Sequence, residues 1–79
     1  MSNRMLFDER AAFAKVGRRI KSLVEFSGVP KGTHGEVTRA DQSGKGYTVA
    51  IQWELPERIG KPLVDWFTRD EYERYLEEV

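Results

Sequence analysis

One stretch near the middle of the chain, YTVAIQWEL at residues 47–55, constrains the fold more than any other. Large apolar side chains alternate there with smaller or polar ones, namely Tyr47, Val49, Ile51, Trp53 and Leu55. A period of two over this length predicts a β-strand with one buried face, and β-branched and aromatic residues suit such a pleated surface. We expect Pro56 to end the strand, because proline has no N–H to donate to a sheet ladder.

The segment before this strand predicts a hairpin. DQSGKG at residues 41–46 holds two glycines among polar residues, and glycine adopts the positive φ angles that tight hairpin turns require. The partner strand is then residues 35–40, with Val37 pointing inward. The middle of the chain is therefore expected to form two antiparallel strands.

Shorter strands are expected on both sides of this hairpin. Residues 19–27 alternate, with Ile20, Ser22, Val24 and Phe26 on one face. Residues 63–67 form a short strand after a loop at 57–62. We expect Val64 and Trp66 to point inward there, since the other set would bury the charge of Asp65, unless Phe67 packs under the following helix.

The two ends of the chain predict helices. Thr68 and Glu71 have the spacing of a capping box, in which each side chain takes a backbone N–H of the other residue. A stripe at helical spacing follows it, made of Tyr72, Tyr75, Leu76 and Val79. We therefore expect a C-terminal helix over about residues 68–78. Residues 1–15 form either a mobile arm or a short helix capped by Asp8.

The 79 residues are enough for one small domain. The chain has no Cys, so neither a disulfide nor a thiolate metal site can hold the fold together. No apolar run is long enough to span a bilayer, and charges occupy the N-terminal stretch where a signal peptide needs apolar residues. We expect a cytoplasmic protein that does not enter the membrane. Residues 16–79 are expected to fold as a mainly β domain, an SH3-like barrel of about five short strands with a C-terminal α-helix.

Part of the chain resembles the KOW-type, SH3-like small barrels. Those domains open with a glycine and an apolar strand and continue to a G-x-x-G-x-V turn. The matching positions here are Gly17, Ile20, Gly32, Gly35 and Val37, and the strand with Val49, Ile51 and Trp53 follows in the same order. The superfamily includes ribosomal and transcription-elongation modules, and it is similar to small electron-transfer accessory subunits such as the variable chain of ferredoxin–thioredoxin reductase. The resemblance implies a protein that binds RNA or another protein.

Charge is balanced overall but uneven along the chain. Residues 1–39 hold eight Lys and Arg against four Asp and Glu, and residues 40–79 hold five against nine. Such asymmetry indicates a basic surface for anionic partners, unless the fold interleaves the two halves so that the signs mix. A nucleic-acid-binding surface would use five cations, Arg18, Arg19, Lys21, Lys31 and Arg39.

The glycine-rich run GVPKGTHGEV at residues 28–37 concentrates the other candidate binding groups. It is not a phosphate-binding P-loop, because Lys31 precedes its glycine and a strand follows. His34 is the only histidine, so a zinc site would need carboxylates beside it. A catalytic triad would need a nucleophile positioned by the fold, either a threonine or one of Ser22, Ser27 and Ser43. We expect a turn that displays Lys31 and His34.

These features favour a non-catalytic interaction or accessory module without a cofactor or metal. The expected partner is another protein, and the alternative is RNA or DNA bound by the cations named above. The predicted protein-binding surface combines the 28–35 loop, the 41–46 hairpin and an aromatic region. Its candidate residues are Lys31, His34, Trp66 and Tyr72, with Tyr75 as a second possible neighbour of Trp66.

Overall fold

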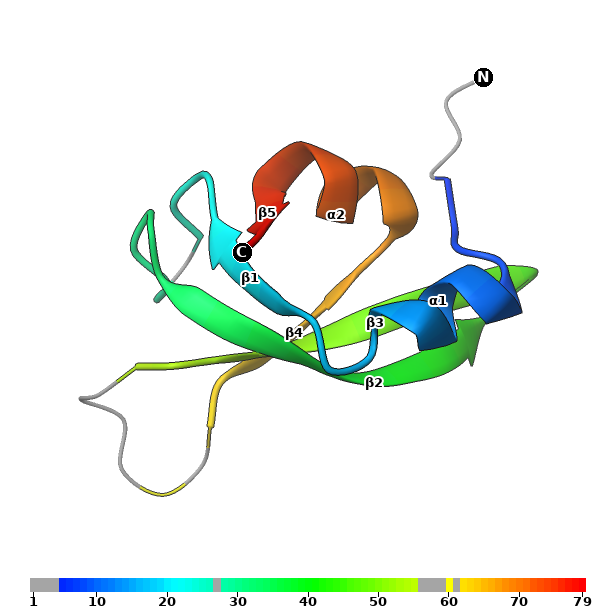
Figure 1. Cartoon of the computed structure of the whole chain (residues 1–79), viewed down its shortest axis with the longest axis horizontal. Coiled ribbons are helices and arrows are strands. Elements are labelled where there is room, and N and C mark those ends of the chain that lie inside the picture. Colours follow the sequence, from blue (N-terminus) through cyan, green and yellow to red (C-terminus); the bar gives the residue numbers. More distant parts are fainter. Residues whose placement is uncertain (1–4, 27, 56–59, 61) are drawn as a thin grey trace.

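The computed structural model describes residues 5–26, 28–55, 60 and 62–79 of the chain, and within them it is mainly β (Figure 1). The elements in chain order are α1 (Glu9–Lys15), β1 (Arg19–Ser22), β2 (His34–Ser43), β3 (Gly46–Trp53), β4 (Val64–Phe67), α2 (Arg69–Tyr75) and β5 (Leu76–Glu78). The strands form one antiparallel sheet in the order β4-β3-β2-β1-β5. Consecutive strands are neighbours from β1 to β4, and β5 returns to the far side of β1.

The β2–β3 hairpin consists of the two longest strands of the sheet. Ser43 pairs with Gly46, which leaves a two-residue turn of Gly44 and Lys45. Gly44 has φ +61° and Lys45 does not have a positive φ, the pattern of a type II′ turn. A bulge interrupts the register between Val37 and Arg39. The hairpin predicted from the glycines is present, and β2 is longer than expected at both ends.

The core lies between the sheet and α2, which covers one sheet face in Figure 1. Val49, Ile51 and Trp53 are buried as the alternation predicts, and Tyr47 and Leu55 are half-buried. The buried cluster draws on every helix and strand, and it consists of Phe7, Ala12, Ile20, Val29, Val37, Ala40, Val49, Ile51, Trp53, Phe67, Tyr72 and Leu76.

Strand β4 faces the opposite way from the prediction. Phe67 is buried at 4% exposure, whereas Trp66 is 46% exposed and Val64 is 38% exposed. Phe67 packs edge-on against Trp53 and Phe26 beneath the helix, at ring-centroid distances of 6.3 Å and 5.5 Å. The Asp65 carboxylate that this orientation turns toward the core accepts a hydrogen bond from the Trp53 indole Nε1 at 2.9 Å. That bond offsets the desolvation of a half-buried carboxylate.

The C-terminal helix begins as predicted and ends early. Both halves of the capping box are present at Thr68 and Glu71. The helix ends at Tyr75, and residues 76–78 form β5 instead of a further turn. Pairing with β1 supplies backbone partners to a strand edge that a longer helix would leave open. Val79, predicted in the buried helical stripe, is 63% exposed.

The N-terminal region is hydrogen-bonded to the start of β3. Phe7 exchanges two backbone hydrogen bonds with Tyr47, at 3.0 and 2.8 Å. The Asp8 side chain then accepts from the Ala11 N–H at 2.7 Å and caps α1. No helix among the described residues has the length and apolar character needed to cross a membrane.

The strand expected at 19–27 is shorter in the structure. β1 ends at Ser22, and the Leu23 N–H donates to the Tyr75 carbonyl rather than to β2. Phe26 still turns inward, held by a separate backbone bridge to Val29. Ser27, Pro56 and most of the 57–62 loop lie outside the described residues.

Candidate functional site

The cations proposed for nucleic acid are almost all paired with carboxylates. The pairs are Arg18–Glu78 at 3.9 Å, Arg19–Glu54 at 2.6 Å, Lys21–Glu77 at 3.4 Å and Arg39–Asp41 at 2.8 Å. Each joins a cation of residues 1–39 to a carboxylate of residues 40–79. The Lys21–Glu77 pair links the neighbouring strands β1 and β5, whereas Arg39 and Asp41 lie on the same strand. Such exposed pairs add little stability. They do neutralise the local field that would attract a phosphate backbone.

The 28–37 loop is held by Ser22, which is fully buried. Its hydroxyl donates to the Pro30 carbonyl at 3.0 Å and accepts from the Thr33 N–H at 3.1 Å. Its backbone N–H donates to the Thr33 carbonyl and its carbonyl accepts from the Gly32 N–H, both at 2.9 Å. Gly32 has φ +90°, a conformation open to glycine. The loop is thus a structured turn, and Ser22 serves it as a hydrogen-bonding centre.

Lys31 and His34 are exposed at this turn, away from Trp66. His34 stands beside Glu54, whose N–H donates to the His34 carbonyl at 2.9 Å. Trp66 on β4 pairs with Ala50 on β3. Glu54 follows Ala50 by four residues of extended chain, a span of about 13 Å. In the described part of the chain, no three His, Asp or Glu side chains gather as a metal site.

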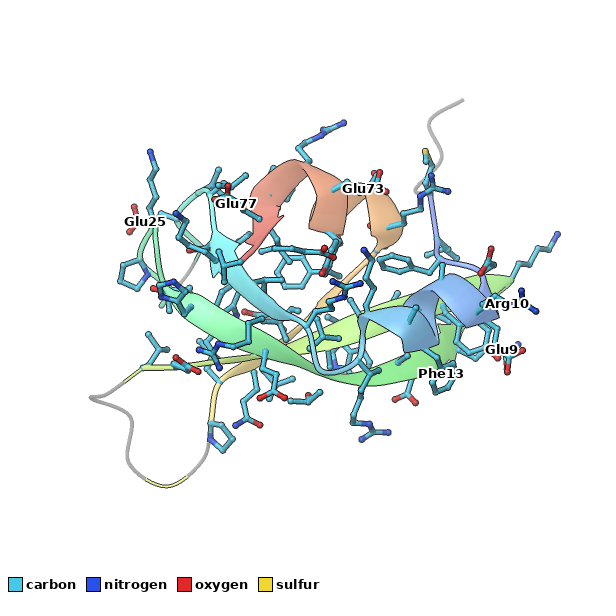
Figure 2. All side chains as sticks on the ribbon, in the orientation of Figure 1. Glu9, Arg10, Phe13, Glu25, Glu73 and Glu77 are labelled. Atoms are coloured by element: carbon cyan, nitrogen blue, oxygen red, sulfur yellow. The ribbon has the colours of Figure 1, made fainter. Side chains whose placement is uncertain are left out.

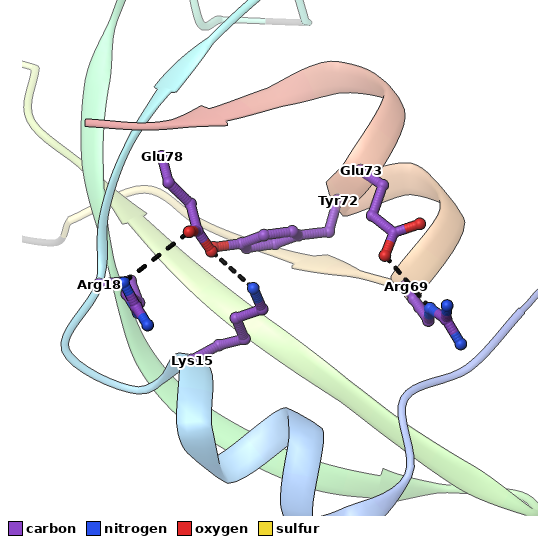
Figure 3. Close-up of polar contacts among 6 residues, drawn as sticks. All are labelled: Lys15, Arg18, Arg69, Tyr72, Glu73 and Glu78. Carbon is purple, nitrogen blue, oxygen red and sulfur yellow. Dashed lines mark hydrogen bonds and ion pairs between the residues drawn. The ribbon is translucent and has the colours of Figure 1, made fainter.

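Tyr72, predicted to face a partner, is a core residue at 3% exposure. Its hydroxyl donates to the Glu78 carboxylate at 2.8 Å, and Lys15 donates to the same oxygen at 2.6 Å (Figure 3). Lys15 also lies 5.1 Å from the centre of the Tyr72 ring. The three side chains join α1, α2 and β5. The network is therefore structural, and Tyr72 does not extend a surface around Trp66.

The same network shifts two pKa values. The Lys15 hydrogen bond, followed by that of Tyr72, holds the pKa of the Glu78 carboxyl below its usual value. Burial, followed by the hydrogen bond to Glu78, raises the pKa of the Tyr72 phenol far above its usual value. Both shifts favour the neutral phenol beside an ionised carboxylate in the folded state.

Trp66 is the large aromatic residue that the fold leaves on the surface of β4. Ala50, its partner on β3, is small, and Arg39, its neighbour one strand further, reaches across it. The Arg39 guanidinium lies 5.8 Å from the centre of the Trp66 ring. Arg39 thus covers part of the Trp66 ring, and the residue remains 46% exposed.

Two open pockets adjoin Trp66. The first, of about 430 Å³, lies toward the hairpin, and its lining residues are Asp41, Gln42, Ser43, Thr48, Trp66, Thr68 and Glu71. The second, of about 310 Å³, lies toward the helix and the aromatic residues. We call β4 together with this second pocket the Trp66 edge, lined by Phe26, Asp65, Trp66, Phe67, Glu71 and Tyr75. The structure therefore brings two parts of the predicted surface together, the hairpin and Trp66, and leaves the 28–35 loop apart.

Of the residues that line the second pocket, only Trp66 and Tyr75 were named from the sequence as candidate partner contacts. A buried tryptophan needs an acceptor for its indole N–H. Asp65 lies in the strand that follows Trp53 along the chain, and consecutive strands often pair, so this requirement was a usable signal. Phe26 lies in the 19–27 segment, which was predicted as one continuous strand, whereas β1 ends at Ser22 and a turn follows. Tyr75, named as an alternative neighbour of Trp66, replaces Tyr72 in the pocket.

The exposed acidic side chains of the C-terminal region lie elsewhere. Glu73 and Glu77, labelled in Figure 2, are exposed, and each forms an ion pair, Glu73 with Arg69 at 3.2 Å and Glu77 with Lys21. They form no part of either pocket lining. No protein-family model, curated protein or solved structure matches the chain, so its geometry is the basis for assigning a function.

Proposed function

We propose that the chain is a small non-catalytic protein-binding module on an SH3-like barrel, and that it binds its partner at the Trp66 edge. The observation that carries the proposal is a half-exposed tryptophan between two open pockets. Tryptophan is over-represented among the residues that dominate the energy of protein interfaces. A rigid indole also loses little conformational entropy on binding.

The sheet order supports the barrel. β5 lies beside β1, so the first and last strands of the domain are neighbours. Side chains from all five strands enter one buried cluster. Helix α2 spans the remaining gap, because it follows β4 directly and leads directly into β5. The helix forms no sheet pairing, so no described strand lies beside the outer edge of β4.

The pairing of cations favours a protein partner over a nucleic acid. Four of the five cations proposed for phosphate contact already have carboxylate partners. A nucleic acid would have to compete with those carboxylates for each contact. Lys31, which has no ion pair with any described residue, would add one contact at most.

Affinity capture from the source cells tests the proposal. The bait is the purified chain, compared with Trp66→Ala and with Phe13→Ala as a matched control. Phe13 is also an exposed aromatic residue, 53% accessible, but it lies on α1 (Figure 2). We expect a partner that is retained by wild type and by Phe13→Ala and lost by Trp66→Ala, with all three chains equally folded by circular dichroism. Retention of every partner by Trp66→Ala, or capture of none, would contradict the proposal.

A further inference from the structure

The outer edge of β4 carries backbone groups that no described residue satisfies. The Trp53 N–H donates to the Leu63 carbonyl at 3.0 Å. Hydrogen-bonded and non-hydrogen-bonded pairs alternate along an antiparallel ladder, so Val64 and Trp66 are the non-bonded residues facing β3. Their N–H and C=O groups therefore point away from the sheet. None of the hydrogen bonds among described residues reaches them.

The pocket of the Trp66 edge lies along this open edge. Asp65, Trp66 and Phe67 all line it, although successive side chains of a strand point to opposite faces. Three consecutive residues line one pocket when that pocket runs beside the strand rather than over one face. An additional strand laid against β4 would thus occupy the pocket and meet the free backbone groups of Val64 and Trp66.

The chemistry of the lining favours a cationic occupant. The described lining residues include no Lys, Arg or His. They provide two carboxylates, Asp65 and Glu71, and four aromatic rings, those of Phe26, Trp66, Phe67 and Tyr75. Asp65 accepts from the Trp53 indole and has no ion pair with a described cation. A guanidinium or ammonium group could therefore lie over an aromatic face while it pairs with a carboxylate.

A second copy of this chain is a poorer occupant. The β4 strand, VDWF, contributes no cation. Two such strands paired side by side would bring the Asp65 carboxylates of both copies to one interface. Like charges that face one another across strands destabilise the pairing.

We infer that the Trp66 edge binds an extended basic segment of another protein, which adds to β4 as a sixth strand. Its backbone pairs with Val64 and Trp66, and an Arg or Lys side chain lies between the aromatic rings and Asp65. Addition to a sheet edge is a recurrent mode of peptide recognition, in which backbone bonds give affinity and side-chain pockets give specificity. This inference rests on the proposed function and names the partner's chemistry.

Defined peptides test strand addition directly. The probe is a blocked peptide of about seven residues in which Arg alternates with Val, titrated into the ¹⁵N-labelled chain at roughly 50 mM salt. We expect amide shifts at Val64 and Trp66 and slower hydrogen exchange of both amides. The same peptide with Glu in place of Arg should cause neither change. Two forms of the peptide carry methyl groups on backbone nitrogens, one at every Arg residue and the other at every Val residue. Their affinities should differ at least about tenfold, because only one set of backbone amides faces β4.

Variants of the chain separate charge from backbone pairing. Asp65→Asn keeps an acceptor for the Trp53 indole and removes the charge, so we expect the Arg peptide to bind about fivefold more weakly. Glu73→Gln removes an exposed carboxylate outside the pocket and should leave affinity unchanged. Val64→Pro deletes an edge N–H that β3 does not use and should reduce binding at least about tenfold. If that variant does not fold, the methylated peptides decide the question.

Several outcomes would overturn the inference. The first is equal binding of the Arg and Glu peptides, and the second is equal binding of both N-methylated forms. The third is protection of the Val64 and Trp66 amides from hydrogen exchange without peptide, together with self-association of the chain in sedimentation. A partner captured in a Trp66-dependent manner, together with no response to the Arg peptide, would leave the proposed function intact and refute this inference alone. Loss of capture dependence on Trp66 would instead refute the proposed function.

Discussion

The Glu78 carboxylate offers the sharpest test of how the domain is held together. One of its oxygens accepts from Lys15 at 2.6 Å and from Tyr72 at 2.8 Å, so it joins α1, α2 and β5 (Figure 3). Glu78→Gln keeps an acceptor for the Tyr72 hydroxyl but removes the negative charge. The Glu78 side chain is 35% exposed, so solvent weakens the charge contribution. We expect the free energy of unfolding to fall by about 1 kcal/mol at neutral pH.

The pH dependence of that loss identifies its cause. Because the folded state lowers the pKa of Glu78, the unfolded chain binds the proton more readily than the folded one. The stabilisation is therefore complete above the unfolded carboxyl pKa of about 4.3 and is lost as pH falls through the lower folded value. The difference between wild type and Glu78→Gln should be constant between about pH 6 and 7 and should shrink below about pH 4.

Urea unfolding followed by tryptophan fluorescence measures both quantities, with the slope of free energy against urea expected to stay unchanged. Glu73→Gln is the control, since the Glu73–Arg69 pair is an exposed pair within one helix and should change stability by less than about 0.5 kcal/mol. A loss at Glu78 no larger than at Glu73, or a loss that persists undiminished at about pH 3, would refute the reasoning.

Four further outcomes are expected. Gly35→Ala should cost about 2 kcal/mol in urea unfolding, because a Cβ there would lie 2.9 Å from the Gln52 carbonyl oxygen, and a loss below about 0.5 kcal/mol would show that the strands separate easily. Thr68→Ala should cost about 1 kcal/mol through the lost helix cap, and Thr68→Ser should restore most of it if the hydroxyl is responsible. Above about pH 10 wild type should lose stability relative to Tyr72→Phe, because the folded state raises the pKa of the Tyr72 phenol and keeps it neutral; parallel stability curves for the two chains would argue against that burial. Titration with a single-stranded oligonucleotide at roughly 50 mM salt should leave the amide signals of residues 18–21 and 31 in place, whereas salt-sensitive shifts there would favour the nucleic-acid alternative.

Part of the candidate site was predictable from local pattern. The 41–46 hairpin, Trp66 and Tyr75 were named from the sequence, and residues of the hairpin and both aromatic residues do line the pockets. The orientation of β4 was not predictable from the strand alone, since its local pattern favours the face that keeps the charge of Asp65 out of the core. Phe67 points inward because it packs against Phe26 and Trp53, and Asp65 is tolerated because the Trp53 indole donates to it. Both reasons involve residues distant in the sequence.

By itself the sequence determined those elements whose cause is local. Nine alternating residues specify β3 through side-chain period, Gly44 specifies the turn through its positive φ, and Thr68 with Glu71 specifies the start of α2 through reciprocal hydrogen bonds. Tertiary structure alone decided where α2 ends, which residues neutralise the uneven charge, and which aromatic residue stays outside. In each case contacts outside the local segment select the outcome, and local pattern does not contain them. The edge of β1 pairs with Leu76–Glu78, and carboxylates such as Glu54 pair with the cations. Phe26 and Trp53 hold Phe67 inward, which leaves Trp66 on the surface.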